Sequence, residues 1–128
     1  VKALDTLCEQ LNLNTKGIYF SLDANPALTL PTNAEGLDLV LYRVAQELAN
    51  NALKYSNATQ VTIKLYVDKQ RVHMTVTDDG DGFDNRNIDS RKGLGLDTMK
   101  ERVRQINGNL DIKSRPGNGT SCTLEVPL

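Results

Sequence analysis

Apolar residues recur along the chain with two different spacings. Spacings of three and four residues predict helices over residues 1–14, 32–55 and 96–106. Alternating apolar and polar residues predict strands over residues 16–22, 61–67, 72–76, 110–113 and 120–126. This order of elements favours an α+β fold. We expect a two-layer sandwich in which a mixed, mostly antiparallel sheet has helices on one face.

Turn and cap residues mark the ends of several elements. Residues 32–35 form a capping box, with Thr and Glu three residues apart, that predicts the start of the long helix. Residues 68–70 predict a hairpin turn, and residues 107–108 (Asn-Gly) predict a left-handed end to the last helix. Residues 79–95 lose all periodicity, and loops of that length are usually functional or mobile.

Length, charge and cysteine content exclude several classes of protein. A chain of 128 residues with a net charge of −1 favours one domain over residues 1–128 and gives no general attraction to nucleic acid. No apolar run reaches the roughly 18 residues of a membrane span. The chain begins without methionine inside a predicted helix, so we expect it to be a piece of a longer protein. Cys8 and Cys122 have no C-x-x-C partner, which predicts buried thiols instead of zinc or disulfide chemistry.

One face of the long helix holds polar residues beside its apolar stripe. Glu47, Asn51 and Lys54 are four and three residues apart, which places them on the same face. Carboxylate and amide oxygens suit Mg²⁺, which keeps several waters and needs only one or two protein ligands. A solvated helix face is the alternative interpretation. The position of Asn51 at the border of the core favours metal binding, because an idle polar group there costs stability.

The segment after the strand at 72–76 combines an acid with glycines. Asp78 is followed by Gly80 and Gly82. A partly buried carboxylate at a strand end can accept a hydrogen bond from an exocyclic amine such as that of adenine. The glycines allow close backbone approach and positive φ. A plain Asp-Gly turn is one alternative. A calcium loop is another, although the chain lacks the downstream glutamate that an EF-hand needs.

Two further glycine-rich segments are candidates for phosphate binding. Residues 93–96 (Gly-Leu-Gly-Leu) open the last helix, whose N-terminus would attract phosphate, but they match neither the P-loop nor the Rossmann pattern. Residues 117–120 form either a hairpin turn or a turn that offers the Thr120 hydroxyl to phosphate. Positive residues in and after the loop suit a triphosphate or a solvated basic face: Arg86, Arg91, Lys92, Lys100, Arg102 and Arg104.

The single histidine, His73, lies on a predicted strand between two apolar residues, so we expect it to face outward. We do not expect it to accept phosphate or bind a metal, because a reactive histidine needs access and an orienting partner.

Taken in order, these motifs resemble the catalytic, ATP-binding domain of bacterial sensor histidine kinases. That family shares the Bergerat fold with gyrase, heat-shock chaperone and mismatch-repair ATPases. Residues 41–55 (LYRVAQELANNALKY) resemble its N box, residues 78–83 (DDGDGF) its G1 box and residues 93–96 (GLGL) its G2 box. Gln46-Glu47, a short lid and the sequence MKERV at 99–103 favour the subfamily that partners helix-turn-helix response regulators.

The resemblance implies a role for each motif residue. Asn51 would hold Mg²⁺, Asp78 would bind the adenine amine and Lys54 would meet phosphate. Glu47 matches the general base of the related hydrolases, and in a kinase it would orient the metal or the attacking imidazole. Thr120 would support the pocket near Asp78 or the phosphates. The other predicted cofactor-binding residues shape the pocket: Tyr55, Gly80, Gly82, Gly93, Leu94, Gly95 and Leu96.

Two positions depart from the family pattern. Tyr55 stands where many members of the subfamily have histidine, which bears on packing against adenine. Arg91 stands where a further glycine often precedes the G2 box, which bears on the flexibility of the lid. Neither departure removes a primary ligand.

The resemblance also implies the reaction and its partners. ATP and Mg²⁺ would bind this domain, and the γ-phosphoryl group would pass to a histidine on a separate dimerisation domain of the same kinase, then to a response regulator. That histidine domain is missing from this chain, so we do not expect autophosphorylation by this piece alone. We expect a cytoplasmic location. The alternatives are an anti-sigma-factor-type serine kinase, a nucleotide-sensing module without turnover and a pure protein-interaction domain.

Overall fold

The computed structural model describes the whole chain except residues 1, 26–27, 29–35, 56 and 83–95. The described residues form three helices: α1 (Lys2–Asn14), α2 (Leu37–Tyr55) and α4 (Leu96–Arg104). They also form five strands: β1 (Tyr19–Ala24), β2 (Gln60–Asp68), β3 (Arg71–Asp78), β4 (Asn109–Ser114) and β5 (Thr120–Pro127). The predicted capping box at 32–35 and most of the predicted loop at 79–95 lie outside the described residues.

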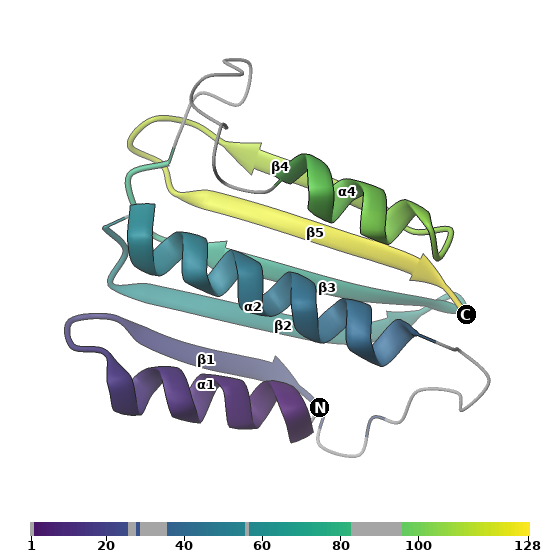
Figure 1. The fold of residues 1–128 in the computed structure, drawn as a ribbon, viewed down its shortest axis with the longest axis horizontal. Helices are drawn as coiled ribbons and strands as arrows, with labels where there is room; N and C mark the ends of the chain where they lie inside the picture. Colours follow the sequence, from purple (N-terminus) through teal and green to yellow (C-terminus); the bar gives the residue numbers. More distant parts are fainter. Residues whose placement is uncertain (1, 26–27, 29–35, 56, 83–95) are drawn as a thin grey trace.

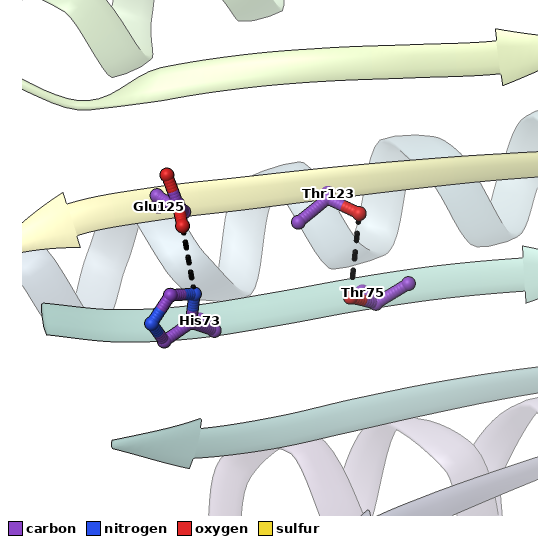
Figure 2. Close-up of polar contacts among 4 residues, drawn as sticks. All are labelled: His73, Thr75, Thr123 and Glu125. Atoms are coloured by element: carbon purple, nitrogen blue, oxygen red, sulfur yellow. Dashed lines mark hydrogen bonds and ion pairs between the residues drawn. The ribbon is translucent and has the colours of Figure 1, made fainter. Parts of the chain in front are cut away.

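The strands form one sheet in the order β1-β2-β3-β5-β4. β1 pairs with β2 in parallel, and the other three pairs are antiparallel. The three helices lie on the same face of this sheet, in front of the strands in Figure 1 and behind them in Figure 2. The predicted α+β sandwich with a mixed, mostly antiparallel sheet and helices on one face is therefore confirmed.

The core lies between α2 and the sheet. The apolar stripe that predicted the long helix is buried from Leu37 to Ala52, and small residues at Ala45 and Ala49 let the helix approach the strands. Val61, Ile63 and Val72 meet it from the sheet and have no exposed surface. Burying a side chain of this size stabilises the fold by about 1.5–3 kcal/mol relative to leaving it in water. This packing fixes α2, and with it the polar face of its C-terminal half, over the central strands.

The first strand begins and ends later than the sequence predicted. The predicted strand covered 16–22, whereas β1 starts at Tyr19, after Gly17 has turned the chain with a φ of 82°. The side-chain amide of Asn12 donates to the Phe20 carbonyl at 2.8 Å and accepts from the Phe20 N–H at 2.7 Å. Asn12 thereby takes the place of a neighbouring strand at the sheet edge. The alternation of residues along β1 could not predict this contact with Asn12.

Two predicted turns, after β2 and before β4, are confirmed. Lys69 and Gln70 form a two-residue hairpin turn in which both have positive φ, 52° and 60°, as the twist of a β-hairpin favours. After α4, Asn107 has a φ of 62° and Gly108 donates its N–H to the Val103 carbonyl at 2.9 Å.

Both cysteines are buried and free, as predicted. Burial raises the pKa of the Cys8 thiol to about 11 and that of Cys122 to about 12. Both therefore stay protonated at neutral pH and act as small apolar residues of the core. None of the helices over the described residues is long and apolar enough to cross a bilayer.

Candidate functional site

Segments that are far apart in sequence meet at one end of the sheet. Figure 1 shows that the C-terminal end of α2, the ends of β3 and β4 and the start of β5 all lie at this end of the sheet. In the strand register, Asp78 on β3 lies opposite Thr120 on β5, which lies opposite Ser114 on β4. Three polar side chains therefore stand in one row across three strands, on the helix-covered face that buries Val76, Cys122 and Ile112 two residues away.

Asp78 is a half-buried carboxyl held by backbone donors. Its Oδ1 accepts the Gly80 N–H at 2.9 Å, and the carboxyl also accepts the Thr120 N–H. Burial raises the pKa of Asp78 above its ordinary value, the two N–H groups oppose that shift, and the neighbouring Asp79 adds to it. The two N–H groups therefore hold the carboxylate in place but do not fully offset the cost of burying its charge. It is suited to accept another hydrogen bond from a ligand.

Two glycines bring the turn after β3 against the β4–β5 turn. Gly82 has a φ of 67°, and a Cβ there would overlap the Arg115 carbonyl oxygen. Gly119 has a φ of 71°, and a Cβ there would overlap the Asp78 carbonyl oxygen. Both positions therefore require glycine for conformation and for space. Gly80 is buried beside them. The sequence predicted Gly80 and Gly82, but it left residues 117–120 as a possible hairpin turn and did not identify Gly119.

A groove of about 920 Å³ opens between these segments. Asp78, Ser114 and Thr120 lie among its lining residues. The complete lining is Thr77, Asp78, Ile112, Lys113, Ser114, Arg115, Pro116, Asn118, Gly119, Thr120 and Ser121. Of the sequence-predicted residues, the structure thus brings Asp78 and Thr120 together at one groove, with Gly80 and Gly82 in the adjoining turn.

Asp79 faces the opposite way from Asp78 and anchors the exit of α2. Its carboxylate accepts the Thr59 hydroxyl at 2.6 Å, the Thr59 N–H at 2.8 Å and the Gln60 N–H at 2.9 Å. Beside it, Asn57 donates to Asp81 at 2.8 Å. These bonds attach the α2–β2 connection to the turn after β3. They place the end of α2 next to the Asp78 turn, an arrangement that the sequence did not reveal.

The helix residues predicted for metal and phosphate lie on the last turns of α2. Glu47 and Lys54 are exposed, and Asn51 is half-buried beside the buried Ala52. The predicted position of Asn51 at the border of the core is confirmed, whereas its role as a Mg²⁺ ligand stays a prediction. Among the described residues, no three His, Cys, Asp or Glu side chains gather into a metal-binding group.

The remaining predicted pocket residues divide into two groups. Leu96 is buried at the start of α4 with 4% of its surface exposed, and Tyr55 is the last residue of α2. Gly93, Leu94 and Gly95, together with Arg91, lie outside the described residues.

His73 lies on the helix-free face of the sheet, as predicted. Figure 2 shows its ring beside Glu125 on β5, with the Thr75–Thr123 pair farther along the same two strands. The His73 Nδ1 is 3.1 Å from the Glu125 carboxylate, and its ring stacks on Tyr66 with centroids 4.6 Å apart. These neighbours leave only 13% of the His73 side chain exposed, on the face opposite to Asp78.

Comparisons with known proteins agree with this fold. The family model for the histidine kinase-, DNA gyrase B- and HSP90-like ATPases matches residues 36–128. The chain is 39% identical over 127 residues to the sensor histidine kinase MctS of Rhizobium johnstonii, covering 98% of this chain and 27% of that protein. It is 35% identical to the sensor histidine kinase ComP of Bacillus subtilis, covering all of this chain and 16% of that protein. The chain thus spans about a quarter or less of these curated relatives.

Solved structures share the architecture at lower identity. The blue-light activated histidine kinase of Erythrobacter litoralis EL346 superposes with a TM-score of 0.78 at 21% identity, over 98% of this chain and 40% of that one. The ATP binding domain of PrrB from Mycobacterium tuberculosis superposes with a TM-score of 0.73 at 19% identity, over 98% of this chain and 91% of that one.

The bonds of Asp79 predict a pH-dependent loss of stability in Asp79→Asn. The Thr59 hydroxyl, followed by the Gln60 and Thr59 N–H groups, holds the pKa of Asp79 below its ordinary value. The charged form therefore stabilises the fold above about pH 4, and this contribution is lost as the pH falls through the lowered pKa. We expect Asp79→Asn to unfold at lower urea concentration than wild type at pH 7, with the difference shrinking below about pH 4.

The matched control is Asp68→Asn, which removes the same charge from an exposed position beside the hairpin turn. It should leave the urea midpoint nearly unchanged. Equal midpoints for wild type and Asp79→Asn at pH 7 would show that Asp79 does not anchor the end of α2.

Proposed function

Because this chain belongs to the family of histidine kinase-, DNA gyrase B- and HSP90-like ATPases, we propose that it binds Mg-ATP in the Asp78 groove and donates the γ-phosphoryl group to a histidine on a separate domain. The observation that carries this proposal is the half-buried Asp78 carboxylate at a groove whose turns only glycine can form. The curated relatives are sensor histidine kinases, which favours phosphotransfer to histidine within two-component signalling. We further propose that the kinase acts on a helix-turn-helix response regulator and that this domain works in the cytoplasm.

Recognition of the base rests on Asp78. The Asp78 carboxylate already accepts the Gly80 and Thr120 N–H groups and still has free lone pairs. An exocyclic amine of the base donates to one of these lone pairs. A hydrogen bond to a charged acceptor in a partly dehydrated groove is stronger than one in water. The same bond would offset the cost that burial places on the charge of Asp78.

The residues of α2 fit the metal and phosphate end of the nucleotide. An amide oxygen at Asn51 and a carboxylate at Glu47 are hard donors one helical turn apart, and Lys54 adds a positive charge one turn farther. Magnesium bound there would neutralise charge on the transferred phosphoryl group. Glu47 is exposed on the same face and would orient the metal or the incoming imidazole. Catalysis by this domain consists of positioning and charge neutralisation.

Transfer of phosphate to histidine is the direct test of the proposed reaction. The chain is incubated with radiolabelled ATP, Mg²⁺ and a purified helical dimerisation domain that bears the acceptor histidine. We expect label on the helical domain that is lost in acid and kept in base, as a phosphoramidate requires. Acid-stable label on serine would instead indicate a serine kinase, and no transfer despite ATP binding would indicate a binding module.

Asp78→Asn should weaken nucleotide binding while stabilising the empty protein. Losing a charge-assisted bond to the amine weakens ATP binding by about 1–3 kcal/mol, roughly fivefold to 150-fold in Kd. Burial raises the pKa of Asp78, so its charge costs stability at pH 7 and the cost disappears as the pH falls below about 4. Asp78→Asn should therefore unfold at a higher temperature than wild type at pH 7, and at nearly the same temperature as wild type below about pH 4.

Calorimetric titration with ATP and thermal unfolding check these two expectations. Asp111→Asn is the control, because it removes the same charge from an exposed position on β4. An unchanged Kd in Asp78→Asn would remove Asp78 from the nucleotide site.

Asn51→Ala should reduce the dependence of ATP binding on Mg²⁺. Removing the amide oxygen takes away a proposed metal ligand and leaves the adenine contacts intact. Titrations with and without magnesium should therefore differ less for the variant than for wild type. Asn50→Ala removes the same amide from the preceding, also half-buried position and should keep the wild-type difference. If Asn51→Ala keeps it as well, Asn51 does not hold the metal.

A further inference from the structure

A chain of hydrogen bonds connects β4 to the Asp78 groove. Ser114 is the last residue of β4, Thr120 is the first of β5, and the two are cross-strand partners. The Ser114 Oγ lies 2.8 Å from the Thr120 Oγ1 and 3.1 Å from the Gly119 carbonyl oxygen. Thr120 in turn gives its backbone N–H to Asp78. All four residues line the groove.

Counting protons fixes the direction of these bonds. A carbonyl oxygen can only accept, so the bond between Ser114 and the Gly119 carbonyl uses the Ser114 proton. A serine hydroxyl has one proton, so Ser114 can only accept from Thr120. The single proton of the Thr120 hydroxyl therefore points toward Ser114. The lone pairs of the Thr120 oxygen are left as acceptors toward the groove.

We propose that Ser114 is a positioning residue that holds the Thr120 hydroxyl as an acceptor, so that the groove selects purine nucleotides with an amino group at position 6 over those with an oxo group. This inference rests on the proposed function and identifies a determinant of its base selectivity. Asp78 and Thr120 present two acceptors from neighbouring strands. An amino group has two protons to donate, one for each acceptor. An oxo group brings a third acceptor, and the single proton on the adjacent ring nitrogen can serve only one of the two protein acceptors.

The test compares binding of ATP and ITP, which differ at the position-6 group and the adjacent ring nitrogen. In Ser114→Ala the Thr120 hydroxyl loses its acceptor and is free to donate to the oxo group of ITP. We expect the ratio of ITP to ATP dissociation constants to fall by about fivefold to tenfold, the worth of one hydrogen bond. Ser114→Thr keeps a hydroxyl and should restore the wild-type ratio.

Two matched variants separate this role from simple packing. Thr123→Ala removes a hydroxyl from the same strand at a position outside the groove, where it pairs with Thr75 on the helix-free face, and should leave the ratio unchanged. Thr120→Val removes the hydroxyl through which Ser114 acts. Adding Ser114→Ala to Thr120→Val should therefore change the ratio no further. Thermal unfolding checks that each variant is folded. If Ser114→Ala is not folded, Ser114→Cys replaces it, with the same expected fall in the ratio.

The possible outcomes distinguish this inference from the proposed function. An unchanged ratio in Ser114→Ala, including one that results from equal weakening of ATP and ITP binding, would overturn the role of Ser114 and leave the proposed function standing. Wild-type protein that binds neither nucleotide would instead overturn the proposed function. A fall in the ratio that persists in the Thr120→Val background would show that Ser114 acts by another route, which also contradicts the proposal.

Discussion

The candidate site depends on two contacts in which a glycine lies directly against a peptide carbonyl. Gly82 meets the Arg115 carbonyl and Gly119 meets the Asp78 carbonyl, and at both positions a Cβ would occupy the space of the oxygen. These contacts hold the turn after β3 against the turn between β4 and β5. The closed side of the groove beside Asp78 follows from this backbone packing. The site is thus first a property of the main chain and only then of its side chains.

The site buries part of the Asp78 carboxylate, and this burial costs folding stability when the group is charged. Asp78 is half-buried, and the two N–H groups that it accepts do not fully offset the cost of its burial, so the pKa of its carboxyl is raised. A ligand amine would supply the missing donor. The empty site therefore stores an unfavourable interaction that binding relieves, which is a common relation between stability and activity in binding sites. Asp79, which anchors α2 through three hydrogen bonds, contributes in the opposite direction.

Sequence patterns predicted the parts of the site that depend on local spacing. The end of β3 at Asp78, the glycines after it and the polar face of α2 followed from alternation, glycine content and helical periodicity. The patterns failed where contacts join distant segments. Asn12 shifts the start of β1 by pairing with Phe20, and Gly119 is required by the backbone of Asp78. Ser114 lies one residue beyond the strand predicted at 110–113, and only the register places it opposite Thr120. Composition near each residue gives no signal for such contacts.

The choice between the two adjacent aspartates shows how a distant turn decides the chemistry of the site. Asp78 and Asp79 are the same residue type and neighbours in sequence, yet burial raises the pKa of one and hydrogen bonds lower that of the other. The pairing of β2 with β3 decides which of them faces the groove, because a slip of one residue exchanges the two faces of a strand. That register is set by the two-residue turn at Lys69 and Gln70, at the opposite end of the hairpin, whose positive φ values close it without an extra residue. The turn therefore selects Asp78 for the groove without touching it, and leaves Asp79 free to anchor α2.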